Sequence, residues 1–242
     1  MKHQFFKKTI FVLSMSFAAT SFAQKAGDTI VGVGLAYISP NTGLSTTNTT
    51  INGATSSYFN GVLGGTTAHI KNELTPSVSV LYMFTDNIAT ELSIGVPPKL
   101  KVDLTIPHAG KYIQDANSAK AFTPAVVAKY LFNSPSDSLR PYLGLGATHA
   151  SFKSVTANQG ADTLVPTLAA QSVSMSSSWA PIYNAGIIYN INDKWSINGS
   201  ISYIPLKSDV VFVGAASAGS PVTTATLKLN PTDYIIRVGY KF

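Results

Sequence analysis

Eight segments of the chain alternate between large apolar residues and small or polar ones. In the last segment, for example, Arg237 and Gly239 alternate with larger apolar neighbours. A period of two residues is typical of a β-strand whose two faces meet different surroundings. The pattern predicts strands at 29–38, 76–84, 88–96, 122–132, 140–148, 179–191, 195–204 and 233–242.

The connections between these segments alternate in length. Residues 85–87, 133–139 and 192–194 form short turns, whereas long stretches rich in Ser, Thr, Asn, Gly and Pro lie near 39–75, 97–121, 149–178 and 205–225. An even number of strands, with short turns at one rim and long loops at the other, is typical of a transmembrane β-barrel. Both ends of the barrel segment then lie at the short-turn, periplasmic rim.

The position of the aromatic residues indicates which face of the strands meets lipid. A soluble barrel packs its apolar face inward, whereas an outer membrane barrel turns that face outward and has an aromatic girdle at each interface. Large aromatic residues gather near the short turns: Phe84, Tyr130, Phe132, Tyr189, Trp195, Tyr240 and Phe242. We therefore expect an all-β protein of the cell outer membrane, an eight-stranded antiparallel transmembrane β-barrel with long extracellular loops.

Composition excludes several other classes. Only 12% of the 242 residues are charged and none is Cys, so a disulfide scaffold, a thiolate metal site and a Cys nucleophile are excluded. The net charge is +6, but three of the 17 basic residues are Lys2, Lys7 and Lys8. Without them, 14 basic residues face 11 acidic ones, a balance that does not predict nucleic-acid binding.

The first 23 residues have the pattern of a secretory signal peptide. The three early lysines precede a short apolar run at 9–19, and Ser21 and Ala23 place small residues at the cleavage positions. The alternative is an N-terminal membrane anchor, which the length of the run disfavours. The predicted organisation is a signal peptide at 1–23 and an outer membrane β-barrel at 24–242.

The sequence offers no convincing catalytic or metal centre. His69, His108 and His149 all lie in or beside the long outer stretches, and no spacing joins one of them to a nucleophile and an orienting acid. No His or carboxylate pair has metal-ligand spacing. We therefore expect neither enzymatic activity nor a cofactor.

Several longer motifs resemble the outer membrane protein W (OmpW) family. They are residues 81–92 (LYMFTDNIATEL), 139–146 (LRPYLGLG), 179–195 (WAPIYNAGIIYNINDKW) and 238–242 (VGYKF). Residues 95–97 (GVP) and 203–210 (YIPLKSDV) are more similar to the AlkL branch of hydrophobic-uptake proteins.

The resemblance implies a passive channel that takes small hydrophobic molecules from outside and releases them sideways into the membrane. It also implies that Tyr240 and Phe242 carry the signal read by the outer membrane assembly machinery. A Trp and a Leu of the family's channel floor correspond here to Trp179 and Ser93, the second being a departure. Trp179 and Asn184 are five residues apart, so both can face inward only if a bulge intervenes.

The inward-facing positions predict a barrel with a charged lower part. Charged residues near the short-turn rim would form a lumen plug, and they are Glu91, Lys129, Arg140, Arg237 and Lys241. Small or apolar residues line the outer half, so the predicted substrate channel comprises Ser93, Trp179, Ile204, Leu227 and Leu229. The alternative is that the charges only neutralise one another so that the barrel can fold.

Two prolines suggest where a solute could leave through the wall. Pro124 and Pro181 fall within the fourth and sixth predicted strands, which flank the fifth. Because proline has no N–H donor, the pair could loosen both edges of the fifth strand. The alternative is that they mark bulges that only bend the wall.

Two other functions remain open at this point. An eight-stranded barrel is barely wider than its own side chains, so it could be a filled structural barrel whose loops bind phage, colicin or a host surface. It could also be a small ion-conducting pore. The expected partners of the channel are outer membrane lipids, small hydrophobic solutes and the assembly machinery.

Overall fold

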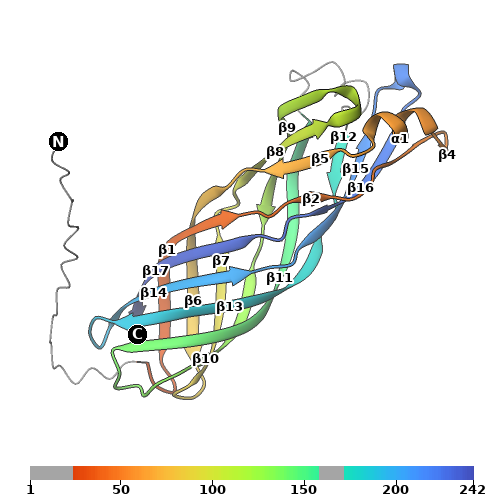
Figure 1. The fold of residues 1–242 in the computed structure, drawn as a ribbon. Coiled ribbons are helices and arrows are strands. Elements are labelled where there is room, and N and C mark those ends of the chain that lie inside the picture. Colours follow the sequence, from red (N-terminus) through yellow and green to blue (C-terminus); the bar gives the residue numbers. More distant parts are fainter. Residues whose placement is uncertain (1–23, 158–171) are drawn as a thin grey trace, which may run out of the picture.

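The computed structural model describes residues 24–157 and 172–242, and the predicted signal peptide lies outside them. Eight antiparallel strands close into a barrel in which the last strand pairs with the first, as predicted (Figure 1). In order around the wall the strands are β1 (Thr29–Ser39), β6 (Glu73–Met83), β7 (Ile88–Gly95), β10 (Ala125–Leu131), β11 (Leu139–Ala157), β13 (Ser178–Asn190), β14 (Trp195–Tyr203) and β17 (Thr232–Lys241).

The long extracellular stretches carry further strands, which the sequence pattern did not predict. One sheet extends β11 with β9 (Lys111–Phe122), β8 (Lys99–Ile106) and β5 (Thr67–Ile70). A second contains β2 (Gly43–Leu44), β3 (Asn48–Ile51), β4 (Ala54–Thr55), β12 (Ser172–Met175), β15 (Lys207–Val213) and β16 (Val222–Lys228). Figure 1 shows both at the end of the barrel opposite the C-terminus, beside α1 (Ser57–Leu63). Short 3₁₀ turns cover Pro107–Ala109 and Ala216–Ala218.

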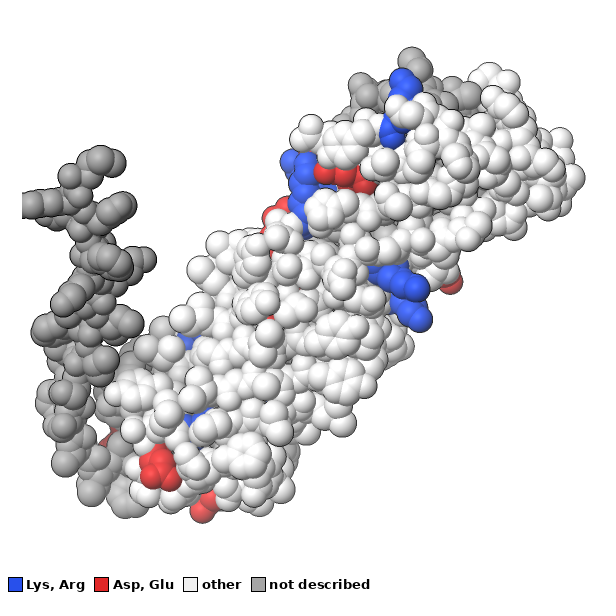
Figure 2. All heavy atoms as spheres, in the orientation of Figure 1, with Lys and Arg blue, Asp and Glu red and all other residues white. Residues whose placement is uncertain are grey.

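The barrel wall has its apolar face outside. Side chains such as Val33, Leu143 and Ile236 are 58–59% exposed, whereas Ser77 and Thr148 on the inner face are buried. Figure 2 shows the corresponding band of the visible surface as largely uncharged, with charged atoms gathered beyond it. This inversion of a soluble core is the arrangement that lipid requires. Among the described residues, no helix has the length and apolar character to cross a membrane.

Aromatic side chains mark both edges of this band. At the short-turn rim, edge-to-face pairs join Tyr240 to Phe242 and Tyr130 to Phe132, with ring centroids 4.9 and 5.2 Å apart. At the other edge Tyr37 lies 6.3 Å from Tyr234. The predicted periplasmic girdle is confirmed. The Tyr37–Tyr234 pair belongs to the opposite aromatic edge, which we call the outer girdle, and it places the outer membrane interface near the upper ends of β1 and β17.

Candidate functional site: the barrel lumen

Three charged side chains from three strands meet inside the lower half of the barrel. Glu91 of β7 accepts a hydrogen bond from Lys129 Nζ at Oε2 (2.9 Å) and one from Arg237 Nη1 at Oε1 (3.0 Å). Arg237 Nε also donates to Ser77 Oγ at 3.1 Å. All three charged residues are 3–5% exposed. We call Glu91, Lys129 and Arg237 the floor network.

The neighbouring side chains support the floor network. Lys129 Nζ lies 4.3 Å from the ring centroid of Tyr142, whose hydroxyl donates to Asn198 Oδ1 at 2.9 Å. A Cβ at Gly186 would come within 2.4 Å of the Tyr142 hydroxyl, so glycine leaves the space that this ring occupies. Buried charges are tolerated only when paired and hydrogen-bonded, and these contacts meet that condition.

The other two residues of the predicted plug lie elsewhere, so the five-residue plug is corrected to three. Arg140 is fully buried at the short-turn rim, where it donates to the backbone carbonyls of Gln24 (2.6 Å) and Asp86. Lys241 forms a separate ion pair with Asp28 at 3.3 Å. Strand alternation predicted the correct inward direction for all five residues but not their heights, because tilted strands displace equivalent positions along the barrel axis.

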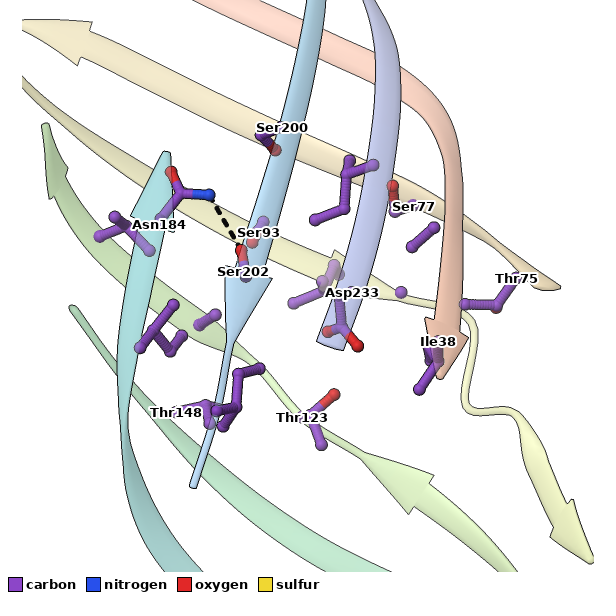
Figure 3. Close-up of a pocket in the computed structure, with 18 of the residues that line it drawn as sticks. Ile38, Thr75, Ser77, Ser93, Thr123, Thr148, Asn184, Ser200, Ser202 and Asp233 are labelled. Atoms are coloured by element: carbon purple, nitrogen blue, oxygen red, sulfur yellow. Dashed lines mark hydrogen bonds between the residues drawn. The ribbon is translucent and has the colours of Figure 1, made fainter. Parts of the chain in front are cut away.

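A cavity of about 80 Å³ lies directly above the floor network and is shown in Figure 3. Glu91 and Arg237 line its lower part, and the carboxyl group of Asp233 points into it. Among the described residues, Asp233 Oδ1 has no hydrogen-bond partner. Most of the remaining labelled side chains are small and polar: Thr75, Ser77, Ser93, Thr123, Thr148, Asn184, Ser200 and Ser202. Apolar residues such as Ala36, Ile182 and Ile204 complete the lining, so the lumen above the floor is lined by a mixture of hydroxyl and apolar groups. We call this space the polar cavity, because the cavities nearer the extracellular end have fewer polar side chains.

The lining becomes apolar closer to the extracellular end. A cavity of about 50 Å³ shares Ile204, Thr148 and Asp233 with the polar one, and its other lining residues include Leu100, Phe152, Leu206 and Leu229. A further cavity of about 30 Å³ lies among Leu44, Val102, Val173, Met175, Val210, Phe212 and Leu227. Four of the five predicted channel residues, Ser93, Ile204, Leu227 and Leu229, thus line these cavities.

Trp179, the fifth predicted channel residue, faces outward. Its side chain is 72% exposed and lies 4.9 Å from the His149 ring, centroid to centroid. The ladder between β11 and β13 keeps one register from Leu139↔Tyr189 to Ala150↔Ser178, without a bulge. Residues five apart therefore face opposite sides, and Asn184 is the inward one. Trp179, which the resemblance assigned to the channel floor, therefore does not line the lumen, and that assignment was wrong.

Both edges of β11 remain paired, contrary to the predicted effect of the two prolines. Pro181 lies opposite Ala147 in the unbroken β11–β13 ladder. Pro124 does not lie inside a strand but in the two-residue break between β9 and β10, and its carbonyl accepts a hydrogen bond from Thr148 Oγ1 at 2.9 Å. On either side of this break the pairing with β11 keeps the same register.

The wall is interrupted instead on the far sides of the strands that β11 contacts. The β7–β10 ladder ends at Ser93↔Ala125, and the next backbone bond across it runs from Ala121 N–H to the Pro98 carbonyl at 3.1 Å. We call this interruption, between 94–97 and 122–124, the β7–β10 seam.

A second interruption lies between β13 and β14, whose ladder ends at Tyr183↔Tyr203. The strand that follows, β15, pairs with β12 and not with β13. Pro97 and Pro98 flank the first interruption, and Pro205 flanks the second. These prolines are the signal that could have identified the seams from the sequence, since each lies two or three residues after the end of a barrel strand.

The fold and the lumen together define a class: an eight-stranded outer membrane barrel with a narrow interior closed by ion pairs. The chain belongs to the OmpW family, whose model matches residues 25–242. It is 29% identical over 231 residues to outer membrane protein W of Vibrio cholerae serotype O1, covering 96% of each chain. It is 25% identical over 184 residues to outer membrane protein AlkL of Ectopseudomonas oleovorans, covering 75% of this chain and 71% of the relative.

Solved structures confirm the fold. The crystal structure of OprG from Pseudomonas aeruginosa superposes with a TM-score of 0.77, at 22% identity, over 92% of this chain and 99% of that one. Membership of the family places the protein in the outer membrane, among barrels that are not enzymes.

Proposed function

We propose that the barrel is a passive channel for small hydrophobic molecules, which enter at the extracellular end and leave sideways through the wall. The observation that carries the proposal is the sequence of linings along the axis. The apolar cavity at Leu229 adjoins the polar cavity at Ser93, which ends on the floor network, and a separate apolar cavity lies at Leu227. A desolvated ionic floor is a barrier to an apolar solute, because displacing its partners would leave buried charges unpaired.

The β7–β10 seam supports a lateral exit. Unpaired backbone groups are costly in hydrocarbon, so membrane barrels normally pair every strand along its whole length. This seam begins at Ser93, which lines the polar cavity, and its outer side carries Ile94 and Val96, both about half exposed. A solute held above the floor would therefore find the wall weakest at the level of the outer girdle, where acyl chains begin.

Neighbouring positions on opposite faces of the seam provide the test. Gly95 lines the polar cavity, and a Cβ there would meet only ordinary contacts at 3.5 and 3.6 Å. Gly95→Phe should fold and fill the inner side of the seam, whereas Val96→Phe adds the same ring to an outward side chain. In cells that lack the native protein, Gly95→Phe should slow uptake of a long-chain ester several-fold, and Val96→Phe should not.

Equal barrel abundance in the outer membrane is required for this comparison. Normal uptake by Gly95→Phe would contradict an exit at this seam. Uptake that does not depend on the protein at all would favour the recognition barrel with a filled lumen. Ion conductance without ester uptake would favour the small pore.

The C-terminal strand is proposed to be the segment read by the assembly machinery. Tyr240 and Phe242 lie on its outward face, their rings pack edge to face, and Phe242 is 78% exposed. Phe242→Ala should lower the amount of folded barrel in the outer membrane of growing cells. The purified variant should still fold in detergent at the normal rate, because the loss concerns recognition and not stability.

A further inference from the structure

Three lysines stand in one row across three neighbouring strands beyond the outer girdle. Lys99 of β8 lies directly opposite Lys120 of β9, and Lys120 lies directly opposite Lys153 of β11. All three side chains are exposed on the outward face. Among the described residues, none of the three has an ion-pair or hydrogen-bond partner. We call Lys99, Lys120 and Lys153 the lysine row.

The acids of the same sheet do not neutralise the lysine row. Asp115 binds Lys71 Nζ at 2.7 Å and Lys101 Nζ at 3.4 Å. Asp103 accepts hydrogen bonds from the Asp115 N–H and the Tyr112 hydroxyl, at 2.7 and 3.0 Å. Like charges directly opposite one another destabilise a sheet. The repulsion within the lysine row therefore lowers the stability of this sheet, and no acid within the described chain offsets it.

The position of the lysine row relative to the lipid-facing band indicates which group could neutralise its charge. Phe122 lies two residues from Lys120 on the same strand face and is 39% exposed. Below it, Val126 and Leu145 continue the outward apolar surface of β10 and β11. The row therefore lies just outside the aromatic edge of the lipid-facing band, at the depth of lipid headgroups.

A second pair of lysines has the same arrangement on the other sheet. Lys207 of β15 lies opposite Lys228 of β16, and both are exposed. Lys207 comes four residues after Tyr203, which is on the outward face near the outer interface. Figure 2 shows basic atoms beyond the uncharged band of the visible face. Opposed lysines at this height thus occur on both sheets that prolong the barrel.

We propose that the lysine row binds the phosphate groups of a phosphorylated glycolipid in the outer leaflet. Ammonium groups donate hydrogen bonds without accepting any, and a phosphate offers several acceptor oxygens and a compensating charge. The apolar surface at Phe122, Val126 and Leu145 receives the acyl chains of the same molecule. An occupant with both a phosphate and acyl chains fits the two adjoining surfaces, whereas a soluble anion would use only the row.

The binding test uses the full mature barrel in detergent with added lipid A. Native mass spectrometry compares retention of the diphosphorylated lipid with that of the same lipid without phosphates. Replacing all three lysines of the row by Gln should weaken retention of the phosphorylated lipid at least roughly ten-fold, given the attraction expected of each basic side chain near an anionic surface. Replacing Lys25, Lys111 and Lys194 by Gln changes the net charge equally and should leave retention unchanged.

A single charge reversal separates lipid binding from folding. Lys120→Glu places an acid between Lys99 and Lys153, so the sheet should be at least as stable as in the native protein while retention of the phosphorylated lipid is lost. Equal retention by Lys120→Glu, or equal retention of the lipid without phosphates, would overturn the proposal. Displacement of the lipid by inorganic phosphate at an equal phosphate concentration would also overturn it, because the row would then be a site for a soluble anion.

Discussion

Two ionic clusters of this barrel each contain a carboxylate that binds two cations, but their surroundings differ. In the floor network, Glu91 binds its two cations at 2.9 and 3.0 Å. The second cluster, which we call the extracellular cluster, consists of Lys71, Lys101, Asp103 and Asp115. In it, Lys71 binds Asp115 at 2.7 Å and Asp103 at 3.5 Å. The floor side chains are at most 7% exposed, whereas about a third of Lys71 and of Asp115 is exposed and only Asp103 is buried.

The distance between two charged groups alone therefore does not determine how much the pair contributes to the stability of the barrel. Water and salt can replace either partner of an exposed pair, and such pairs contribute little. The side chains of the floor network are nearly fully buried, so removing one partner leaves the others as buried charges without compensation, and the members stabilise the barrel as a set. The floor can then seal the lumen, while the extracellular cluster mainly fixes the path of the β8–β9 hairpin.

The largest expected effect is on the floor network. Glu91→Gln leaves Lys129 and Arg237 buried without an acid and should lower the free energy of unfolding by about 3–5 kcal/mol. Urea unfolding in lipid vesicles, followed by tryptophan fluorescence, measures this change. Asp115→Asn is the matched control, since it also removes one carboxylate that binds two cations. Equal losses in the two variants would show that burial does not distinguish the clusters.

The next prediction concerns the barrier itself. Glu91→Ala combined with Arg237→Ala should open space in the floor and raise the conductance of the barrel to small ions in planar bilayers. Asp28→Ala combined with Lys241→Ala removes an ion pair at the rim and should leave conductance unchanged, because that pair lies outside the floor network. Unchanged conductance in the floor variant would mean that other side chains, such as Tyr142, close the lumen.

The sequence predicted the membrane part of the fold better than the part outside it. Below the outer girdle, large apolar residues alternate with small ones and face lipid, which made the eight barrel strands visible. Above it the apolar residues face inward, as Leu100 and Val102 do, and lysines face water. The period of two persists in β8, but charged residues such as Lys99 and Lys101 gave this stretch the composition of a loop.

The candidate site divides in the same way. Parity along a strand correctly turned Glu91, Lys129 and Arg237 inward. It also showed that Trp179 and Asn184 cannot both face inward without a bulge, but it did not show which of the two does. Parity does not give the height of a residue in a tilted barrel, which is why Arg140 and Lys241 were wrongly grouped with the floor. Parity also does not show which edge of a strand a proline affects. The prolines therefore wrongly predicted weak pairing at the two edges of β11, whereas the interrupted ladders are β7–β10 and β13–β14.

A smaller effect should follow from weakening the extracellular cluster. Lys71→Gln should leave global unfolding of the barrel nearly unchanged, because Lys71 is partly exposed and both acids keep other partners. Asp115 keeps Lys101, and the buried Asp103 keeps the Asp115 N–H and the Tyr112 hydroxyl. Hydrogen exchange should increase in the β8–β9 hairpin and not in β13 or β14. High salt should produce the same local change in the native protein, and a salt-independent hairpin would contradict the assignment of this cluster as screened.

Acid provides the last and mildest perturbation of the same cluster. The hydrogen bond from Lys71 is the main influence that holds the pKa of Asp115 below its usual range. Burial acts to raise the pKa of Asp103, but the Asp115 N–H and the Tyr112 hydroxyl outweigh it, and the net shift is downward.

A carboxyl whose pKa is lower in the folded state stabilises that state above its ordinary pKa of about 4, and this contribution disappears as the pH falls through the lowered values. After correction for intrinsic rates, exchange in the β8–β9 hairpin should therefore be constant from pH 7 to about 5 and rise below about 4. Strands β13 and β14 carry no acidic residue and serve as the internal reference. Asp103→Asn combined with Asp115→Asn should abolish the acid step, and a step that survives in this variant would place its origin elsewhere in the barrel.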